Sequence, residues 1–325
     1  MNVLITGITG SFGHALYHQV KKVPGLRIFA GSRNPERVNF LLEDPEVVVR
    51  RFDFCDPETY RSALEDIDSL VLVRPPALAK PRKNIFPFID ECVKSGVGHI
   101  LYLSVQRVPS ARHIPPARIE AYIRSKTIDY TFLRPGVFME NLITRHREEI
   151  KRSSTLVVPA CRGRTAMVAI RDVAAAGAQC IINPVHRNRE YEIAGPRFYS
   201  WEETAAMLSA ETGRTVTCNS SGTIGFFRHR RKIGDSRGTI KMLALMYRAA
   251  GREGNRPGRG EGKSGRVKSE TDRVKSETGR VAGKHGRIKE KAGQTEKQSG
   301  TLERVFGINP TDLASFIRQN RDYFV

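Results

Sequence analysis

The sequence predicts an α/β fold in which a doubly wound parallel sheet is followed by a smaller α+β lobe. Strand-like and helix-like segments alternate over the first 135 residues, the pattern of a parallel sheet covered by helices. A glycine-rich turn joins the first strand to the first helix. Beyond residue 150 the pattern is looser. We therefore expect residues 1–150 to form the sheet domain, residues 151–250 and 301–325 a substrate lobe, and residues 251–300 an insertion.

The strands of the first domain are expected at residues 2–6, 26–30, 47–49, 69–73, 99–103 and 130–133. Helices are expected at 14–22, 35–42, 86–94 and 117–124. Ligands of such sheets bind outside the carboxyl ends of the strands. Five residues at those ends are therefore of interest: Arg33, Asp53, Arg74, Ser104 and Pro135.

The turn after the first strand runs from Gly7 to Gly13. Gly7 lets the chain turn, Gly10 lets the backbone approach a pyrophosphate, and Gly13 lets the helix pack closely on the strand. The start of the helix adds free N–H groups and a partial positive charge. The turn predicts a bound dinucleotide, with contacts from Gly7, Thr9, Gly10, Ser11, Phe12 and Gly13.

The end of the second strand bears on which dinucleotide is bound. An acidic residue here is typical of NAD(H) sites, whereas an arginine facing the 2′-phosphate is typical of NADP(H) sites. Ser32 and Arg33 stand at this position, and Glu36 lies one helical turn further on. NADP(H) is therefore expected in preference to NAD(H), with Arg33 and Ser32 on the phosphate. The alternative is a solvated arginine.

Two further strand ends supply candidate cofactor contacts. Asp53 and Phe54 follow the third strand and are expected to contact the adenine by a side-chain hydrogen bond and by stacking. A plain turn is the alternative. Arg74, at the end of the fourth strand, is included among the expected cofactor contacts.

Several motifs taken together resemble the NmrA-like family of atypical short-chain dehydrogenases/reductases. They are the opening glycine turn and the segments 72–76, 101–106, 129–141, 193–196, 200–203 and 301–316. The resemblance implies a Rossmann fold that binds NADP(H). It also implies one of two functions: reduction of a small electrophile such as a quinone, or a non-catalytic NADP(H)-sensing role that regulates a protein partner.

The catalytic residues are harder to assign. Typical short-chain dehydrogenases use a serine, a tyrosine roughly a dozen residues later, and a lysine that lowers the pKa of the tyrosine. Counted from Ser104, that spacing reaches Ala117 and Ala121, which cannot transfer a proton. Tyr122 and Lys126 match the residue types but stand at the end of their helix, where a lysine also complements the dipole. Ser104, Tyr122 and Lys126 are the candidates, and a quinone-like acceptor could instead take its proton from water.

The residues after the last strand are expected to line the substrate site. Phe138 and Asn141 are the candidates, with Met139 beside them, and a core position between the lobes is the alternative. In the lobe, Ser200 and Glu203 predict the start of a helix at 200–212. No metal site is expected. Three isolated histidines of the lobe are expected to face solvent: His146, His186 and His229.

Residues 251–300 depart from the rest of the chain. Arginine recurs every seven residues from 252 to 287, and the segment holds 14 basic and 7 acidic side chains, a net charge of +7. Only one apolar residue occurs in each repeat, which is too little to offset the entropy of ordering, so disorder is expected instead of a coiled coil. Weak, salt-sensitive association with polyanions is expected from its charge.

The composition limits the remaining possibilities. A hydrophobic fraction of 39% can supply an ordinary core. No run approaches the ~20 apolar residues of a membrane helix, so a cytoplasmic location without membrane contact is expected. The cysteines have no CxxC spacing and are odd in number, and all are expected to be reduced: Cys55, Cys92, Cys161, Cys180 and Cys218.

Overall fold

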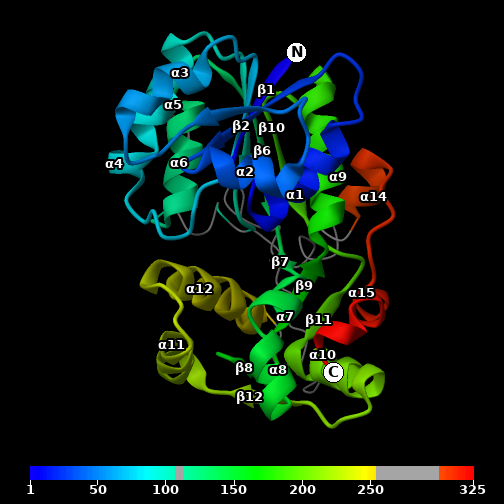
Figure 1. The fold of residues 1–325 in the computed structure, drawn as a ribbon. Helices are drawn as coiled ribbons and strands as arrows, with labels where there is room; N and C mark the ends of the chain where they lie inside the picture. The colour runs from blue at the N-terminus through cyan, green and yellow to red at the C-terminus, as the bar shows by residue number, and fades with distance from the viewer. Residues whose placement is uncertain (107, 109–112, 254–299) are drawn as a thin grey trace, which may run out of the picture.

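The structure of the protein is a computed structural model that describes residues 1–106, 108, 113–253 and 300–325 (Figure 1). Two units lie one above the other in Figure 1. The upper unit is built on a large sheet, and the lower, smaller unit carries short strands and most of the later helices. The carboxyl ends of the large sheet's strands point towards the lower unit, so the junction between the units is where a ligand of the sheet would bind.

The large sheet has seven strands in the order β10-β6-β5-β4-β1-β2-β3, and every neighbouring pair is parallel. This order reverses direction at β1, as in a Rossmann fold, so the predicted doubly wound α/β fold is confirmed. The strands are β1 (Asn2–Thr6), β2 (Arg27–Ser32), β3 (Val48–Arg51), β4 (Ser69–Leu72), β5 (His99–Leu103), β6 (Asp129–Pro135) and β10 (Arg189–Ile193).

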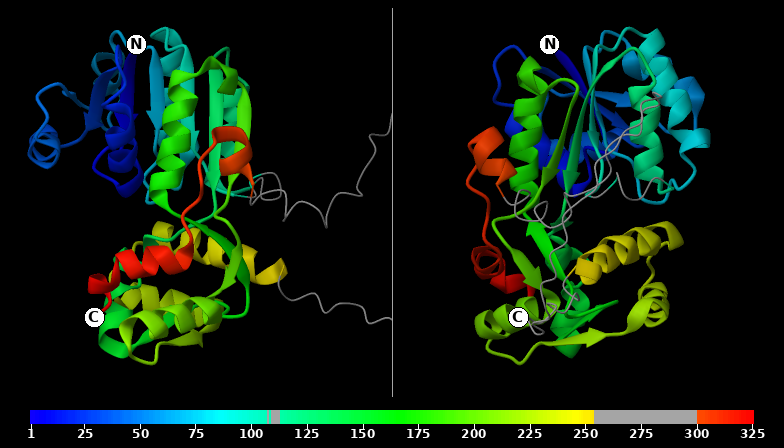
Figure 2. Two further views of the ribbon diagram at one scale, coloured as in Figure 1. Left: turned by 90° about the vertical axis from the view of Figure 1, so that its right-hand side faces the viewer. Right: turned by 180° about the vertical axis from the view of Figure 1, so that it is seen from behind.

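Helices cover both faces of this sheet (Figures 1 and 2). One face carries α1 (Ser11–Val20), α2 (Pro35–Leu42) and α9 (Ile170–Ile182), and the other α3 (Tyr60–Leu64), α4 (Pro81–Asn84), α5 (Phe86–Lys94) and α6 (Pro115–Arg124). Successive side chains of a strand point to opposite faces. Accordingly, Val3 and Ile5 belong to the core under α1 and α9, whereas Leu4 belongs to the core under α3, α5 and α6.

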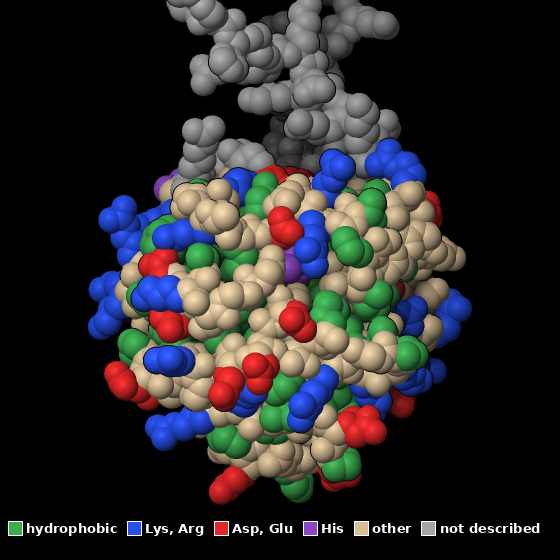
Figure 3. Space-filling view, turned by 90° about the horizontal axis from the view of Figure 1, so that it is seen from above, with side chains coloured by type: hydrophobic (Ala, Val, Ile, Leu, Met, Phe, Trp, Pro, Cys, Tyr) green, Lys and Arg blue, Asp and Glu red, His purple; other side chains and the backbone are tan. Residues whose placement is uncertain are grey.

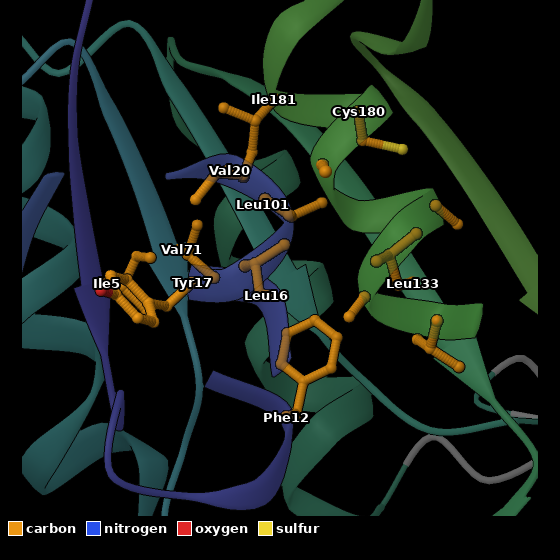
Figure 4. Packing of buried hydrophobic residues seen from close by; sticks show 14 of the residues in the cluster. Ile5, Phe12, Leu16, Tyr17, Val20, Val71, Leu101, Leu133, Cys180 and Ile181 are labelled. Carbon is orange, nitrogen blue, oxygen red and sulfur yellow. The ribbon is translucent and has the colours of Figure 1, made fainter. Parts of the chain in front are cut away.

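The core between α1 and α9 is closely packed (Figure 4). Phe12 and Leu16 of α1 lie against Leu101 and Leu133 of the strands, and Ile181 of α9 closes the same cluster. Leu16 is completely buried, and burying a leucine side chain contributes roughly 1.5–3 kcal/mol. This cluster fixes the start of α1, and with it the glycine turn, relative to the sheet.

The lower unit combines two small sheets with six helices in the described residues. One sheet has the order β11 (Phe198–Ser200), β9 (Arg164–Val168), β7 (Val137–Phe138), and the other pairs β12 (Thr217–Ser220) with β8 (Thr155–Val158). Around them lie α7 (Asn141–Thr144), α8 (Arg147–Ser153), α10 (Trp201–Thr212), α11 (Gly222–Lys232), α12 (Arg237–Glu253) and α15 (Leu313–Gln319). The capping box predicted at Ser200 and Glu203 is present.

The chain passes between the two units more often than a single boundary at residue 150 implies. The predicted substrate lobe began at residue 151 and so contained β10, but β10 forms an edge of the seven-stranded sheet, next to β6. Helix α9 packs on α1, and α14 (Thr301–Phe306) packs on α9 and β10. The local sequence pattern of a strand or helix does not reveal which sheet the element joins. For this reason β10, α9 and α14 were predicted to lie in the lobe.

One prediction about the cysteines is wrong. Cys161 and Cys218 form a disulfide with their Cα atoms 6.0 Å apart, although 57 residues separate them in the sequence. The parallel pairing of β12 with β8 brings the two segments together, and spacing along the chain carries no sign of this pairing. Cys92 and Cys180 are buried thiols, whereas Cys55 is exposed.

Two of the histidines predicted to face solvent are also placed differently. His146 is completely buried and His186 is nearly so, while the His229 side chain remains 29% exposed. His146 is hydrogen-bonded to Glu149, three residues later, and to the distant Tyr247, and His186 is hydrogen-bonded to Tyr191 of β10. The sequence around His146 and His186 therefore gave no indication of these contacts.

The structure describes only a small part of the basic segment 251–300, for which polyanion association is predicted. Residues 254–299, which make up nearly all of the heptad-repeat segment, lie outside the described residues. Figure 3 views the end of the molecule farthest from the lower unit, where Lys and Arg side chains stand among Asp and Glu side chains.

Within the described chain, no helix has both the length and the apolar character needed to cross a bilayer.

Candidate functional site

The glycine turn between β1 and α1 has the geometry of a phosphate cradle. The N–H of Gly10 donates to the carbonyl of Gly7 at 2.9 Å, and a Cβ on Gly13 would lie 2.4 Å from that same carbonyl oxygen. Gly10 is the N-cap of α1 and supplies no capping side chain, and the first turn carries no acidic residue. The helix start therefore offers backbone N–H groups and a positive dipole end to an anion.

The end of β2 places a free cation beside this turn. Arg33 is exposed and makes no ion pair or hydrogen bond within the described residues. Ser32 is less available, because its Oγ accepts the N–H of Asn34 and donates to the Asn34 carbonyl. Asn34 in turn caps α2 by accepting the N–H of Arg37. The Arg37 side chain is also exposed and makes no ion pair or hydrogen bond within the described residues.

Asp53 and Phe54 are engaged by their own surroundings. Asp53 Oδ1 accepts the N–H of Cys55 at 2.9 Å, which closes a local turn. Phe54 is buried, and its ring lies edge-on to Phe52 and Phe88 at 4.7 and 5.6 Å. The structure thus gives Phe54 a packing role in place of the expected adenine stacking, and the plain-turn alternative describes Asp53.

Arg74 supports a loop instead of reaching into open space. Its guanidinium donates to the carbonyls of Pro75 and Leu78, both at 2.9 Å. The same loop contacts the lower unit, because a Cβ on Gly238 of α12 would lie 2.8 Å from the Pro76 carbonyl oxygen. Arg74 therefore holds the loop that contacts α12, and its contact with a cofactor stays a prediction.

Ser104 belongs to a buried charged network. Its Oγ donates to Glu120 of α6 at 2.5 Å, and Arg134 of β6 donates to both oxygens of Glu120 at 2.9 and 2.5 Å. Arg134 also pairs with Glu190 of β10 at 2.6 Å. Burial alone would lower the pKa of Arg134, but the two carboxylates raise it above its usual value. The Ser104 hydroxyl proton is therefore committed to Glu120 and is not free for a substrate.

Tyr122 and Lys126 lie on another part of the domain. The Tyr122 hydroxyl donates to both oxygens of Asp90 at 2.8 Å, and Lys126 pairs with the same carboxylate at 2.6 Å. The Tyr122 ring stacks on Phe86 at 3.8 Å. Because Lys126 immediately precedes β6, this pair lies near the amino ends of the strands. The structure does not bring it to Ser104, which follows the carboxyl end of β5.

The segment after β6 lies at the junction of the two units. Phe138 is half-buried against the upper core, and Asn141 begins α7 with part of its surface exposed. Met139 is completely buried in the core of the lower unit, as the core alternative for this segment describes. Phe138 and Asn141 therefore remain the candidates for substrate contact.

Glu140 was not among the site residues predicted from the sequence. Its Oε1 accepts the N–H of Ile170 at the start of α9 at 2.9 Å, while its Oε2 is buried without a hydrogen-bond partner in the described residues. Burial raises the pKa of Glu140 to about 7. A glutamate inside an apolar run could have drawn attention, but its partner is 30 residues away in the sequence.

The site combines a parallel sheet, a start of α1 without a capping side chain, and two arginines after β2 that have no partner within the described residues. These features are typical of a dinucleotide-binding α/β protein of the Rossmann type. The chain belongs to the NmrA-like family, whose model matches residues 1–235. The expected resemblance is therefore confirmed.

Similar proteins cover most of the chain. Quinone oxidoreductase 2 of Escherichia coli (strain K12) is 27% identical over 249 residues, which are 74% of this chain and 85% of that protein. Prestalk A differentiation protein A of Dictyostelium discoideum is 26% identical over 217 residues, 66% and 71% of the two chains. The structure of Citrobacter sp. triphenylmethane reductase complexed with NADP(H) has a TM-score of 0.74 at 21% identity and covers 98% of this chain and 99% of that chain. At this identity the structural likeness shows the fold.

Proposed function

We propose that this chain is an NADPH-dependent oxidoreductase that reduces a small electrophile such as a quinone. The observation that carries the proposal is an α1 start without a capping side chain next to Arg33, which has no partner within the described residues. A backbone cradle suits a pyrophosphate, and a free arginine beside it suits a 2′-phosphate. Support for the activity comes from relatives named as quinone oxidoreductase 2 and NAD(P)H azoreductase, which are 27% and 26% identical.

The residues of the chain have distinct tasks in this proposal. Bound NADPH supplies the hydride. The turn from Gly7 to Gly13 holds the pyrophosphate, and Arg33 with Arg37 selects the 2′-phosphate. Phe138 and Asn141 orient the acceptor at the junction of the two units. Because the Ser104 proton is held by Glu120, the acceptor takes its proton from water, which suits a quinone better than a simple ketone.

The test is a turnover assay with purified protein. NADPH is bound first, and the loss of its nicotinamide absorbance is followed with a panel of quinones and enals. We expect oxidation of NADPH that depends on the acceptor and saturates with its concentration. Tight NADPH binding without turnover of any acceptor would contradict the reductase proposal.

A second function is favoured by one specific observation. Every member of the typical catalytic set is replaced or engaged elsewhere: Ala117 and Ala121 occupy the expected positions, and Ser104 is bonded to Glu120. These features suit a non-catalytic NADP(H) sensor that acts on a protein partner. In that case NADPH and NADP⁺ should bind with different affinities, and the same acceptor panel should leave NADPH unoxidised.

A further inference from the structure

Helix α12 is anchored in the lower unit by one of its faces. The side chains of this face belong to the core of that unit and are at most 5% exposed: Ile240, Leu243, Ala244 and Tyr247. The Tyr247 hydroxyl is hydrogen-bonded to the buried His146 ring at 3.0 Å, and the ring centroids of Tyr247 and Trp201 are 4.7 Å apart. These contacts fix the position of α12 on the lower unit.

The opposite face of α12 meets two loops of the upper unit. At Gly238 the helix approaches the loop after β4 so closely that a Cβ would lie 2.8 Å from the Pro76 carbonyl oxygen. Two helical turns later, Leu245 packs against a small cluster between β5 and α6, formed by Val108, Ile114 and Ala117. Residues seven positions apart lie on the same side of a helix. Helix α12 therefore spans the carboxyl ends of β4 and β5 (Figures 1 and 2).

The strand order decides which half of the dinucleotide lies nearest α12. A dinucleotide crosses a doubly wound sheet where the strand order reverses, which is at β1 in this sheet. In the proposed function Arg33 after β2 takes the 2′-phosphate, so the adenosine half lies over β2 and β3. The nicotinamide half then lies over β4 and β5. An acceptor in contact with the nicotinamide is therefore also in reach of α12.

The side chain between the two contacts of α12 is Met242. It stands four residues after Gly238 and three before Leu245, on the same face of the helix. It is partly exposed and belongs to none of the hydrophobic cores of the described residues. A methionine side chain is flexible, and its sulfur makes favourable contacts with aromatic rings. Lys241 borders this face but is exposed, so its charge stays in water.

Building on the proposed function, we propose that Met242 selects the acceptor and that the acceptor is a fused-ring aromatic compound such as a naphthoquinone. The two contacts of α12 with the upper unit are ~10 Å apart along the helix, because each of seven residues rises 1.5 Å. A fused two-ring system fills this span more completely than a single ring. Met242 contacts the second ring, which a one-ring quinone lacks. The hydride still passes from NADPH to the quinone, and Met242 touches no reacting atom.

The experiment compares naphthoquinone with benzoquinone as acceptors for the purified full chain. For each variant, the kcat/KM of either quinone is divided by its wild-type value, which cancels the different intrinsic reactivities of the two quinones. We expect Met242→Gln to lower this ratio about 3- to 10-fold for naphthoquinone, through KM, and less than about twofold for benzoquinone. Met242→Leu, which stays apolar, should restore most of the naphthoquinone value. The affinity for NADPH should be unchanged in both variants.

Two further variants frame this result. Ile224→Gln is the matched control, because Ile224 is an exposed apolar residue of the neighbouring helix α11. It should leave the ratios of both quinones at the wild-type value. Gly238→Ala keeps Met242 but places a Cβ against the Pro76 carbonyl, so that the helix or the loop must shift. It should lower the naphthoquinone ratio more than the benzoquinone ratio.

A binding measurement separates the role of Met242 from the reductase activity. The full chain with bound NADP⁺ is titrated calorimetrically with naphthol, a two-ring aromatic that accepts no hydride. We expect Met242→Gln to weaken naphthol about 3- to 10-fold. Absence of naphthol binding, equal losses for the two quinones, or an effect of Met242→Gln no larger than that of Ile224→Gln would each overturn the role of Met242. Naphthol binding that weakens as expected, without turnover of either quinone, would support that role and contradict the reductase proposal alone.

Discussion

The two ends of the large sheet's carboxyl edge differ in how their polar side chains are engaged. At the β1–β2 end, the α1 start has no capping side chain and Arg33 is unpaired within the described structure. At the β5–β6 end, Ser104 and Arg134 are both bonded to the buried Glu120. The first end is prepared for a ligand, and the second is complete without one. In the proposed function, binding of the dinucleotide therefore depends on the first end, and each end can be altered without the other.

The largest effect on stability is expected when Glu120 is removed from the charged network at the β5–β6 end. Glu120→Ala leaves the buried Arg134 to share the partly exposed Glu190 with Arg124, and removing one partner of a buried ion pair costs about 3–5 kcal/mol of unfolding free energy. Denaturant unfolding followed by circular dichroism measures it. Glu148→Ala, at an exposed carboxylate, is the control and should stay near wild type. A loss as small as that of the control would show that the network is not a structural one.

The next effect concerns Glu140, between the sheet and the lobe. Its pKa of about 7 exceeds the ordinary 4.5, so the folded state favours the protonated carboxyl. The stability that it contributes is fully present below pH 4.5 and is lost as the pH rises through about 7. Ionisation then costs about 2–3 kcal/mol.

Glu140→Gln keeps the acceptor for the Ile170 N–H but cannot ionise. We therefore expect this variant to match the wild type near pH 4.5 and to be more stable by about 2–3 kcal/mol at pH 8. Denaturant titrations at the two pH values measure the difference, with Glu148→Gln as an exposed control. An unchanged pH dependence would contradict the assignment.

The β1–β2 end is tested by substituting Arg33 and Arg37, the two arginines that follow β2. Arg33→Gln combined with Arg37→Gln should weaken NADPH binding about 10- to 100-fold, because charge-assisted bonds to the 2′-phosphate are lost. NADH, which has no such phosphate, should bind almost as before. Arg27→Gln at the opposite end of β2 is the matched control. Fluorescence titration gives the affinities, and equal losses for the two cofactors would contradict the preference.

The smallest effect is expected at Tyr122. Tyr122→Phe removes a hydroxyl bonded to Asp90 and should cost about 1 kcal/mol of stability. Turnover, measured with the acceptor found in the reductase assay, should be unchanged. A large fall in kcat at normal stability would return Tyr122 to the catalytic candidates.

The features that could be predicted from the sequence are the local ones. Gly13 is set against Gly7 a few residues before it, and Arg33 follows its strand directly, so a short motif contains the relevant geometry. Glu120 is 16 residues from Ser104 and 14 from Arg134, and nothing in those intervals links them. The disulfide and the place of β10 in the large sheet are non-local in the same way. The glycine turn and Arg33 could therefore be predicted from the sequence. The hydrogen-bonded network of Ser104, Glu120 and Arg134 could not.

The interleaving of the two units has a consequence for synthesis on the ribosome. The large sheet reaches its last strand, β10, only after β7, β8 and β9 of the lower unit have been made. Helix α14 of the upper unit comes later still, and α15 completes the lower unit close to the C-terminus. Neither unit can close its core before these later elements have been made. The apolar flank of β6 stays uncovered until residues 170–193 emerge, so during translation this protein is exposed to aggregation at an unfinished sheet edge.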